Sequence, residues 1–199
     1  MIRIAVTPEE IHPSEPGFIA MILNRGWDYV HLRHPAASLS DMKHLIDSIP
    51  QTLHRKIRIH GHFEMLASYN IGGIHLNRRC PAAPSTYNGN LSRSCHSYQE
   101  IQSITDSHTD YVTLSPVFDS LSKSGYRSQF SLEEMAAQNK ILHSSVNIKV
   151  IGLGGVTPEN AKSLISAGFD GFAVLGYLMS APDLEVLSYR LDEFDQISN

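Results

Sequence analysis

The sequence predicts a single (β/α)8 barrel domain over residues 1–199. Short strand-like runs alternate with helical segments along the whole chain, and we count eight such passages of about 25 residues each. Within several strands, apolar and polar side chains also alternate with period two. A doubly wound open sheet is the alternative fold.

The expected strands are Ile2–Val6, Tyr29–Arg33, Ile57–His60, Gly73–Leu76, Leu91–Cys95, Tyr111–Ser115, Ile148–Ile151 and Gly171–Leu175. The expected helical segments are Gly17–Arg25, Leu39–Leu53, Phe63–Tyr69, Ser97–Thr105, Ser131–Leu142, Asn160–Ala167 and Asp183–Phe194. The fourth strand is followed by a loop rich in proline and asparagine.

The phase of the second strand places Val30 and Leu32 on one face and His31 and Arg33 on the other. The same alternation holds in two other strands, at Ile57, Arg58, Ile59 and His60 and at Val112, Thr113, Leu114 and Ser115. In a barrel, the apolar face packs under the helices, and polar residues at the carboxyl ends of the strands collect at the catalytic end.

Composition excludes several classes of protein. A net charge of −4 lacks the basic excess of nucleic-acid binders, so we expect no nucleic-acid partner. The chain opens with a strand, and no apolar run is long enough to span a membrane, so we expect a soluble, cytoplasmic protein with no membrane partner. Cys80 and Cys95 lack the spacing of a zinc or redox motif and are expected to be reduced structural thiols.

A glycine-rich turn after the seventh strand is the strongest signal for a ligand site. Gly154 and Gly155 lie between the strand and a helix that Thr157 would cap and Pro158 would begin. Such a turn lets backbone N–H groups approach an anion. With Gly176 just after the eighth strand, these glycines occupy the usual phosphate site of such barrels. The alternative is a tight structural turn.

Other polar residues near strand ends are candidates for binding substrate. Ser115 ends the sixth strand, and the loop after it carries Ser120, Ser122 and Lys123, which suit a lid that holds phosphate. Arg33 could bind phosphate or carboxylate, or form a salt bridge at the rim. The alternative for the loop is a solvated surface segment.

Eleven histidines are present, and five lie near expected strand ends. These five are His31, His60, His62, His75 and His96. Strand phase favours His31 and His60 as catalytic acid/base residues, because both lie on the polar face beside Arg33. No carboxylate or thiol has a convincing ligand spacing beside them, so we expect no metal site.

The chain resembles the thiamine phosphate synthase family, which includes the thiazole tautomerase (TenI) branch. The resemblance covers nearly the whole length. It rests on Tyr29-Val30-His31-Leu32-Arg33, Gly73-Ile74-His75-Leu76, Ser94-Cys95-His96-Ser97, Asp110-Tyr111-Val112, Ser115-Pro116-Val117-Phe118 with Lys123, Gly152-Leu153-Gly154-Gly155-Val156-Thr157 and Ala167-Gly168-Phe169-Asp170-Gly171.

The resemblance implies a (β/α)8 barrel that handles thiazole phosphate. It places the thiazole phosphate on Gly154, Gly155 and Gly176. It matches Ser120, Ser122 and Lys123 to a loop that meets the pyrimidine diphosphate in synthases, and it matches Ser94 to the serine before the family histidine.

Departures from the synthase pattern are concentrated at the metal site. The resemblance sets His60 and Gly61 where synthases have an Asn-Asp pair, and Cys80 where they have a second aspartate. Both magnesium carboxylates are therefore missing, and Pro35 replaces a lysine of the diphosphate end. A change from aspartate to glycine resembles the tautomerase branch, although the histidine expected there falls at Pro116.

These features favour a metal-independent thiazole tautomerase, an isomerase in which His31 or His60 moves a proton. A first alternative is thiamine phosphate synthase, a transferase that joins aminopyrimidine diphosphate to thiazole phosphate. A second alternative is a non-catalytic protein that binds thiazole phosphate or thiamine phosphate. No cofactor is expected, with Mg²⁺ needed only by a synthase, and a homodimer is an open possibility.

Overall fold

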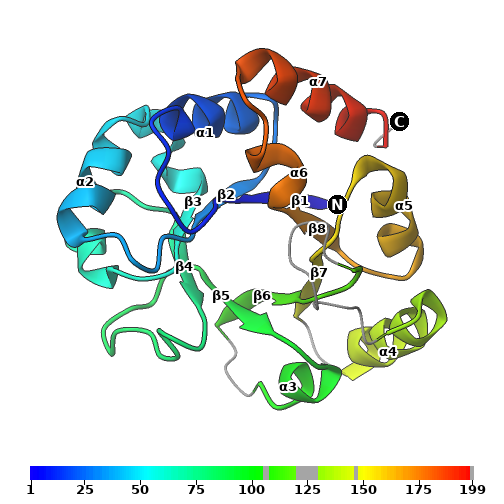
Figure 1. Cartoon of the computed structure of the whole chain (residues 1–199). Helices are drawn as coiled ribbons and strands as arrows, with labels where there is room; N and C mark the ends of the chain where they lie inside the picture. Colours follow the sequence, from blue (N-terminus) through cyan, green and yellow to red (C-terminus); the bar gives the residue numbers. More distant parts are fainter. Residues whose placement is uncertain (105–107, 120–129, 146–147, 198–199) are drawn as a thin grey trace.

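Eight parallel strands close into a barrel, as the sequence predicts (Figure 1). The computed structural model describes residues 1–104, 108–119, 130–145 and 148–197. The strands follow one another around the barrel in chain order, and β8 pairs with β1 to close it. Their bounds are β1 Ile2–Val6, β2 Tyr29–Leu32, β3 Ile57–Ile59, β4 Gly73–Leu76, β5 Leu91–Cys95, β6 Thr109–Leu114, β7 Lys149–Leu153 and β8 Gly171–Val174.

Helices surround the strands in an outer ring (Figure 1). They are α1 Glu15–Asn24, α2 Leu39–Asp47, α3 Tyr98–Gln102, α4 Leu132–Ser145, α5 Pro158–Ser166, α6 Gly176–Met179 and α7 Leu184–Asp195, with two 3₁₀ helices, η1 Gln51–Lys56 and η2 Phe63–Ala67. The connection between β4 and β5 contains no helix. It is the loop that its proline and asparagine content predicts.

Three expected helices are corrected by the structure. The segment expected as one helix over Leu39–Leu53 ends as α2 at Asp47 and resumes as the 3₁₀ helix η1. Pro50 separates the two because it has no N–H for a helical hydrogen bond. The segment Phe63–Tyr69 forms only the short 3₁₀ helix η2. The helix expected over Ser97–Thr105 is limited to α3 within the described residues, and Thr105 lies outside them.

The hydrophobic core has two parts, of which the alternating strand pattern predicts the larger. The larger part lies between the outer face of the strands and the helices, and it includes Val30, Leu32 and Leu114. A smaller cluster fills the barrel and contains Ile4, Val6, Tyr111, Ile151 and Ala173. The inward-facing positions that are not apolar supply the polar residues of the site.

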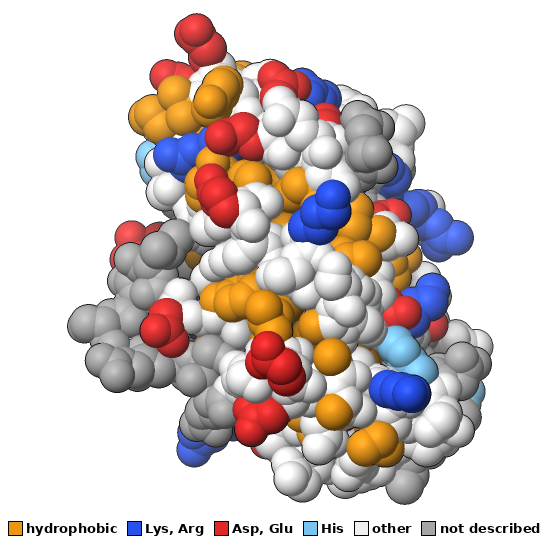
Figure 2. Space-filling model, turned by 90° about the vertical axis from the view of Figure 1, so that its right-hand side faces the viewer, with side chains coloured by type: hydrophobic (Ala, Val, Ile, Leu, Met, Phe, Trp, Pro, Cys, Tyr) orange, Lys and Arg blue, Asp and Glu red, His pale blue; other side chains and the backbone are white. Residues whose placement is uncertain are grey.

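The outer surface mixes apolar and charged side chains. Figure 2 shows, on the face at the right-hand side of Figure 1, apolar side chains in several separate patches among acidic and basic ones. Within the described residues, no helix is long and apolar enough to cross a membrane.

Candidate functional site

The carboxyl ends of the eight strands meet at one end of the barrel, which we call the mouth. The turn after β7 is the most constrained part of it. Gly154 and Gly155 have φ angles of 103° and 64°, which side chains rarely adopt. A Cβ atom on Gly155 would lie 2.3 Å from the carbonyl oxygen of Asp119. The turn therefore requires glycine, both for its backbone conformation and for its close approach to the segment after β6.

Backbone hydrogen bonds join this turn to the neighbouring segment. The N–H of Val117 donates to Leu153 (3.0 Å), and the N–H of Phe118 donates to Gly154 (3.1 Å). Asn160 braces the turn from the other side: its Oδ1 accepts from the N–H of Thr157 (2.9 Å), and its Nδ2 donates to the carbonyl of Gly155 (2.8 Å). Sequence reasoning identified the cap and the proline but missed this role of Asn160.

The predicted third glycine lies beside the turn. Gly176 is the first residue of α6, and β8, which precedes it, pairs with β7. The structure therefore brings Gly154, Gly155 and Gly176 together at one side of the mouth. Thr157 is the N-cap of α5 and Pro158 its first residue, as predicted.

The two predicted acid/base histidines are in direct contact. His31 Nδ1 lies 2.9 Å from His60 Nε2, and His31 Nε2 lies 2.6 Å from the hydroxyl of Tyr111. His31 is 1% exposed, whereas His60 is only partly buried and follows β3 directly. His60 is therefore the member of the pair that a ligand in the mouth can reach.

A third histidine, His75, completes the cluster. Its ring stacks on that of His60, with centroids 4.3 Å apart. Its Nδ1 lies 2.8 Å from the hydroxyl of Ser92 and its Nε2 lies 2.9 Å from that of the predicted binding residue Ser94. Ser94 thus holds an imidazole in the ligand-free protein. The sequence placed His75 near a strand end, but its contacts with His31 and His60 come from the pairing of β2, β3 and β4.

Burial keeps the three imidazoles neutral. Loss of hydration disfavours the charged form, so the pKa values of His31 and His60 lie well below their ordinary value, and repulsion between two protonated imidazoles of the cluster would lower them further. Burial, with the nearby charges of Arg58 and Arg93, lowers the pKa of His75 to about 3. All three therefore act as neutral donors and acceptors at physiological pH.

The ligand atoms of these histidines lie within 4.8 Å of one another, which raises the question of a metal ion. Mg²⁺ requires oxygen ligands, and imidazole nitrogen does not suit it. A Cβ on Gly61 would lie 3.8 Å from Cys80 Sγ, so the structure does bring together the two positions to which the resemblance assigns the metal carboxylates. Neither residue supplies an oxygen side chain. The residues at this position therefore do not fit Mg²⁺.

The histidine cluster is not arranged for a metal ion that prefers nitrogen ligands either. The rings of His60 and His75 stack with an interplanar angle of 23°, and both nitrogens of His75 contact serine hydroxyls. An ion would have to displace these contacts. Our expectation of no metal site stays a prediction.

Arg33 forms the rim salt bridge that the sequence left as the alternative. Its Nη2 lies 3.0 Å from Glu9 Oε1, and its backbone N–H donates to the hydroxyl of Thr7 (2.9 Å). Thr7 also lies 3.1 Å from His34 Nε2, which contacts Glu15 Oε1 at 2.7 Å. Sequence reasoning missed this buried group, because strand phase gave no reason to single out His34.

The remaining predicted residues lie near β6. The hydroxyl of Ser115 is 3.4 Å from His96 Nδ1, which also contacts the carbonyl of Ser115 at 3.0 Å. Ser120, Ser122 and Lys123 lie outside the described residues. Their roles, and that of the loop as a lid, stay predictions.

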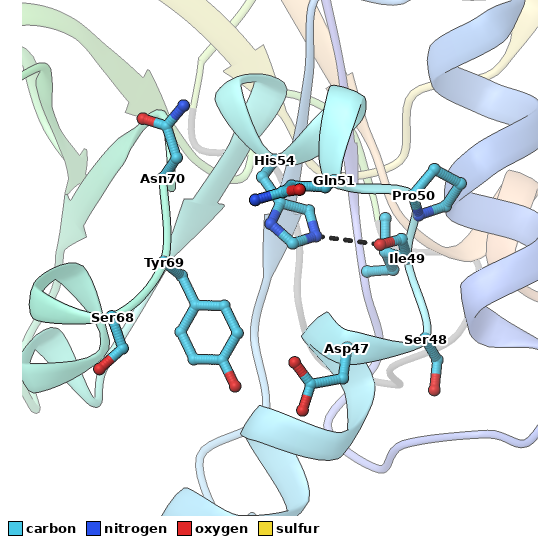
Figure 3. A pocket seen from close by; sticks show the side chains of 9 residues that line it. All are labelled: Asp47, Ser48, Ile49, Pro50, Gln51, His54, Ser68, Tyr69 and Asn70. Atoms are coloured by element: carbon cyan, nitrogen blue, oxygen red, sulfur yellow. Dashed lines mark hydrogen bonds between the residues drawn. The ribbon is translucent and has the colours of Figure 1, made fainter.

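A pocket of about 580 Å³ lies away from the mouth. It is lined by the end of α2 and by η1, which precede β3, and by Tyr69 and Asn70, which precede β4. Segments that precede strands lie at the end of the barrel opposite the mouth. Figure 3 shows the hydroxyl of Tyr69 and the carboxylate of Asp47 directed toward the same space, with His54 bonded to the carbonyl of Ile49. None of the predicted site residues lines it.

The structure thus defines a (β/α)8 barrel with a glycine turn after β7 and a histidine-lined mouth. Comparison with known families agrees with this class. The family model for thiamine monophosphate synthase matches residues 4–178, and the chain belongs to this family.

Individual relatives carry the same name. The thiamine-phosphate synthase of Lysinibacillus sphaericus is 33% identical over 95 residues, a match that covers 48% of this chain and less than half (43%) of that relative. The thiamine-phosphate synthase of Moorella thermoacetica is 24% identical over 164 residues, which cover 80% of this chain and 76% of the relative.

Solved structures are similar over the full length. The crystal structure of thiamine phosphate pyrophosphorylase from Bacteroides thetaiotaomicron has a TM-score of 0.85 and 29% identity, and the match covers 100% of this chain and 98% of that one. The thiamine phosphate pyrophosphorylase of Pyrococcus furiosus has a TM-score of 0.78 at 20% identity and shows the shared fold alone.

Proposed function

We propose that this chain binds a thiazole phosphate in the mouth of the barrel and aromatises the thiazole by moving a proton. The observation that carries the proposal is the hydrogen-bonded pair His31 and His60, which lies in the part of the mouth where the resemblance places the metal carboxylates of synthases. Proton transfer needs an acid/base group and no metal ion. A neutral, partly exposed His60 is suited to this task.

The phosphate site supports the same substrate class. The turn at Gly154 and Gly155 and the beginning of α6 at Gly176 offer backbone N–H groups at one side of the mouth. β7 lies across the barrel from β3, the strand that His60 follows. A ligand anchored there by its phosphate would extend its ring toward His60.

Thiamine phosphate synthase is the second candidate, and the names of the relatives favour it. That reaction must stabilise a departing diphosphate. Gly61 and Cys80 give Mg²⁺ no oxygen side chain, so positive charge would have to come from elsewhere, for example from the exposed Arg78 and Arg79. At 24–33% identity, the relatives' names support the family more strongly than they support one of its reactions.

The test is an NMR time course on the non-aromatic thiazole carboxylate phosphate, with purified protein and EDTA in deuterated buffer. We expect aromatisation and deuterium incorporation well above the protein-free rate. His60→Gln should lower this rate by about 10²- to 10⁴-fold while ligand binding persists, since general acid/base catalysis contributes this much. His143→Gln is the matched control, because His143 lies on α4 and contacts Asp170 at the opposite end of the barrel.

The same samples separate the alternatives. Formation of thiamine phosphate after addition of aminopyrimidine diphosphate and Mg²⁺, without aromatisation in EDTA, would replace the tautomerase by the synthase. Binding of thiazole phosphate or thiamine phosphate without turnover in either assay would leave a non-catalytic binding protein. An unchanged rate in His60→Gln would exclude His60 as the acid/base residue.

A further inference from the structure

A chain of hydrogen bonds leads from the interior of the barrel to the mouth. It runs from the hydroxyl of Tyr111 on β6 to His31 on β2 (2.6 Å) and from His31 to His60 after β3 (2.9 Å). Tyr111 is 2% exposed and His31 is 1% exposed, so solvent does not supply competing partners. The direction of the chain decides which nitrogen of His60 carries its proton.

The hydroxyl of Tyr111 determines the direction at the interior end. Among the described residues its hydrogen-bond partner is His31 Nε2, and burial raises the pKa of Tyr111, so the hydroxyl keeps its proton. A buried hydroxyl hydrogen without an acceptor costs about 1 to 3 kcal/mol. If the hydroxyl accepted from His31, its hydrogen would have no acceptor among these residues, so Tyr111 donates to His31 Nε2.

The tautomers of the two histidines follow from this hydrogen. A neutral imidazole has one N–H donor and one acceptor nitrogen. Because His31 Nε2 accepts from Tyr111, its proton is on Nδ1 and is donated to His60 Nε2. His60 Nε2 then accepts, and the proton of His60 is on Nδ1. The described residues give His60 Nδ1 no hydrogen-bond partner, so this N–H remains for a ligand.

We propose that Tyr111 and His31 are positioning residues that hold His60 in the tautomer with its proton on Nδ1, so that the mouth offers an N–H donor to the ligand. This donor selects ligands that place an acceptor there, such as the carboxylate of a thiazole carboxylate phosphate. The selectivity rests on the proposed function, whereas the tautomer is a property of the ligand-free protein. An experiment can therefore contradict the selectivity without contradicting the tautomer, and the reverse.

Tyr29 supplies a matched control for Tyr111. The two rings stack with centroids 5.8 Å apart and an interplanar angle of 9°, and Arg58 lies 4.0 Å from the ring of Tyr29. The two tyrosines thus share a packing environment, but the hydrogen bond to His31 belongs to Tyr111. A comparison of Tyr111→Phe with Tyr29→Phe therefore separates the loss of the hydrogen bond to His31 from a general change in packing.

The first measurement is two-bond ¹H–¹⁵N correlation NMR on ligand-free, ¹⁵N-histidine-labelled protein, with His60→Gln used to assign the His60 signals. We expect Nδ1 to be protonated and Nε2 unprotonated in both His31 and His60. Tyr111→Phe should shift His60 toward the Nε2-protonated tautomer, and Tyr29→Phe should leave it unchanged. A wild-type His60 with its proton on Nε2 would overturn the proposal even if Tyr111→Phe did not fold.

The second measurement is binding of the aromatic thiazole carboxylate phosphate and of thiazole phosphate without the carboxylate. We expect Tyr111→Phe to reduce the preference for the carboxylate by about tenfold, the effect of losing one hydrogen bond to a charged group. Tyr29→Phe should retain the preference within about twofold, a change too small for a lost hydrogen bond. Equal effects of the two variants would assign Tyr111 a packing role only and would contradict positioning.

Discussion

Gly155 illustrates how the site constrains a single residue. Its φ angle is 64°, and a Cβ atom added to it would lie 2.3 Å from the carbonyl oxygen of Asp119, so no larger residue fits without movement of the turn. The motif GLGG alone is compatible with an ordinary tight turn. The close packing against the segment after β6 adds a structural reason for glycine that the sequence did not reveal.

We predict that Gly155→Ala lowers the free energy of unfolding by about 1 to 3 kcal/mol, the usual cost of a strained backbone. It should also weaken binding of thiazole phosphate by about tenfold or more, because the N–H groups of the turn must move. Urea denaturation and calorimetric titration measure the two effects.

Gly168→Ala is the control for this substitution. Gly168 has a φ angle of 82°, and a Cβ there would lie 3.3 Å from that of Asn139, away from the mouth. The Gly168→Ala variant should be less stable than the wild type but should bind thiazole phosphate with unchanged affinity. If Gly155→Ala bound thiazole phosphate as tightly as the wild type does, the turn would not be part of the phosphate site.

At the scale of the element, α5 and the turn before it act as one unit. Asn160 lies in the first turn of α5 and bonds both Thr157 and Gly155. The helix therefore fixes the turn as well as following it. Recognition of a cap in the sequence describes only the first of these two roles.

We predict that Asn160→Ala costs about 1 kcal/mol of stability, as the loss of a capping interaction does. It should weaken binding of thiazole phosphate by about three- to tenfold, because the carbonyl of Gly155 loses its amide partner. Binding is measured by calorimetry and stability by urea denaturation.

Ser38→Ala offers a comparison of similar size. Ser38 caps α2 by accepting from the N–H of Asp41 at 3.1 Å. This variant should lose a similar amount of stability, with unchanged affinity. If both variants lost affinity equally, the effect of Asn160 would be general destabilisation.

At the scale of the whole molecule, the barrel brings together three neutral imidazoles, from β2, from the residue after β3 and from β4. The folded state resists their protonation, whereas the unfolded chain binds a proton at each with a pKa of about 6.5. Below that pH the unfolded state binds more protons, so stability is fully present above about pH 6.5 and is lost as the pH falls. For His75 the loss continues toward its folded pKa of about 3.

We predict that the free energy of unfolding falls between about pH 7.5 and about pH 5.5, with each histidine contributing about 1.4 kcal/mol per pH unit below about pH 6.5. Urea titrations at several pH values measure the slope. His75→Gln should flatten it, whereas His44→Gln, at an exposed position on α2, should not. A slope that His75→Gln leaves unchanged would contradict neutral burial of His75.

The sequence by itself determined the class of fold, the inward polar face and the glycine turn, because these follow from local rules. Period-two alternation assigns His31 and His60 to one face, and a glycine pair before a capped helix marks a turn wherever it occurs. The same local rules gave the wrong end for the helix that Pro50 interrupts and the wrong lengths for the short helices, because helix ends are weakly specified by sequence.

Only the tertiary structure decided which of these groups meet. Tyr111 and His31 are 80 residues apart in sequence, and closure of the barrel brings their side chains within 2.6 Å. Pairing of β4 with β5 places two serines against His75, and burial inside the barrel keeps its ring neutral by removing it from water. The protonation state and the direction of the hydrogen bonds depend on these long-range contacts, which no local pattern in the chain encodes.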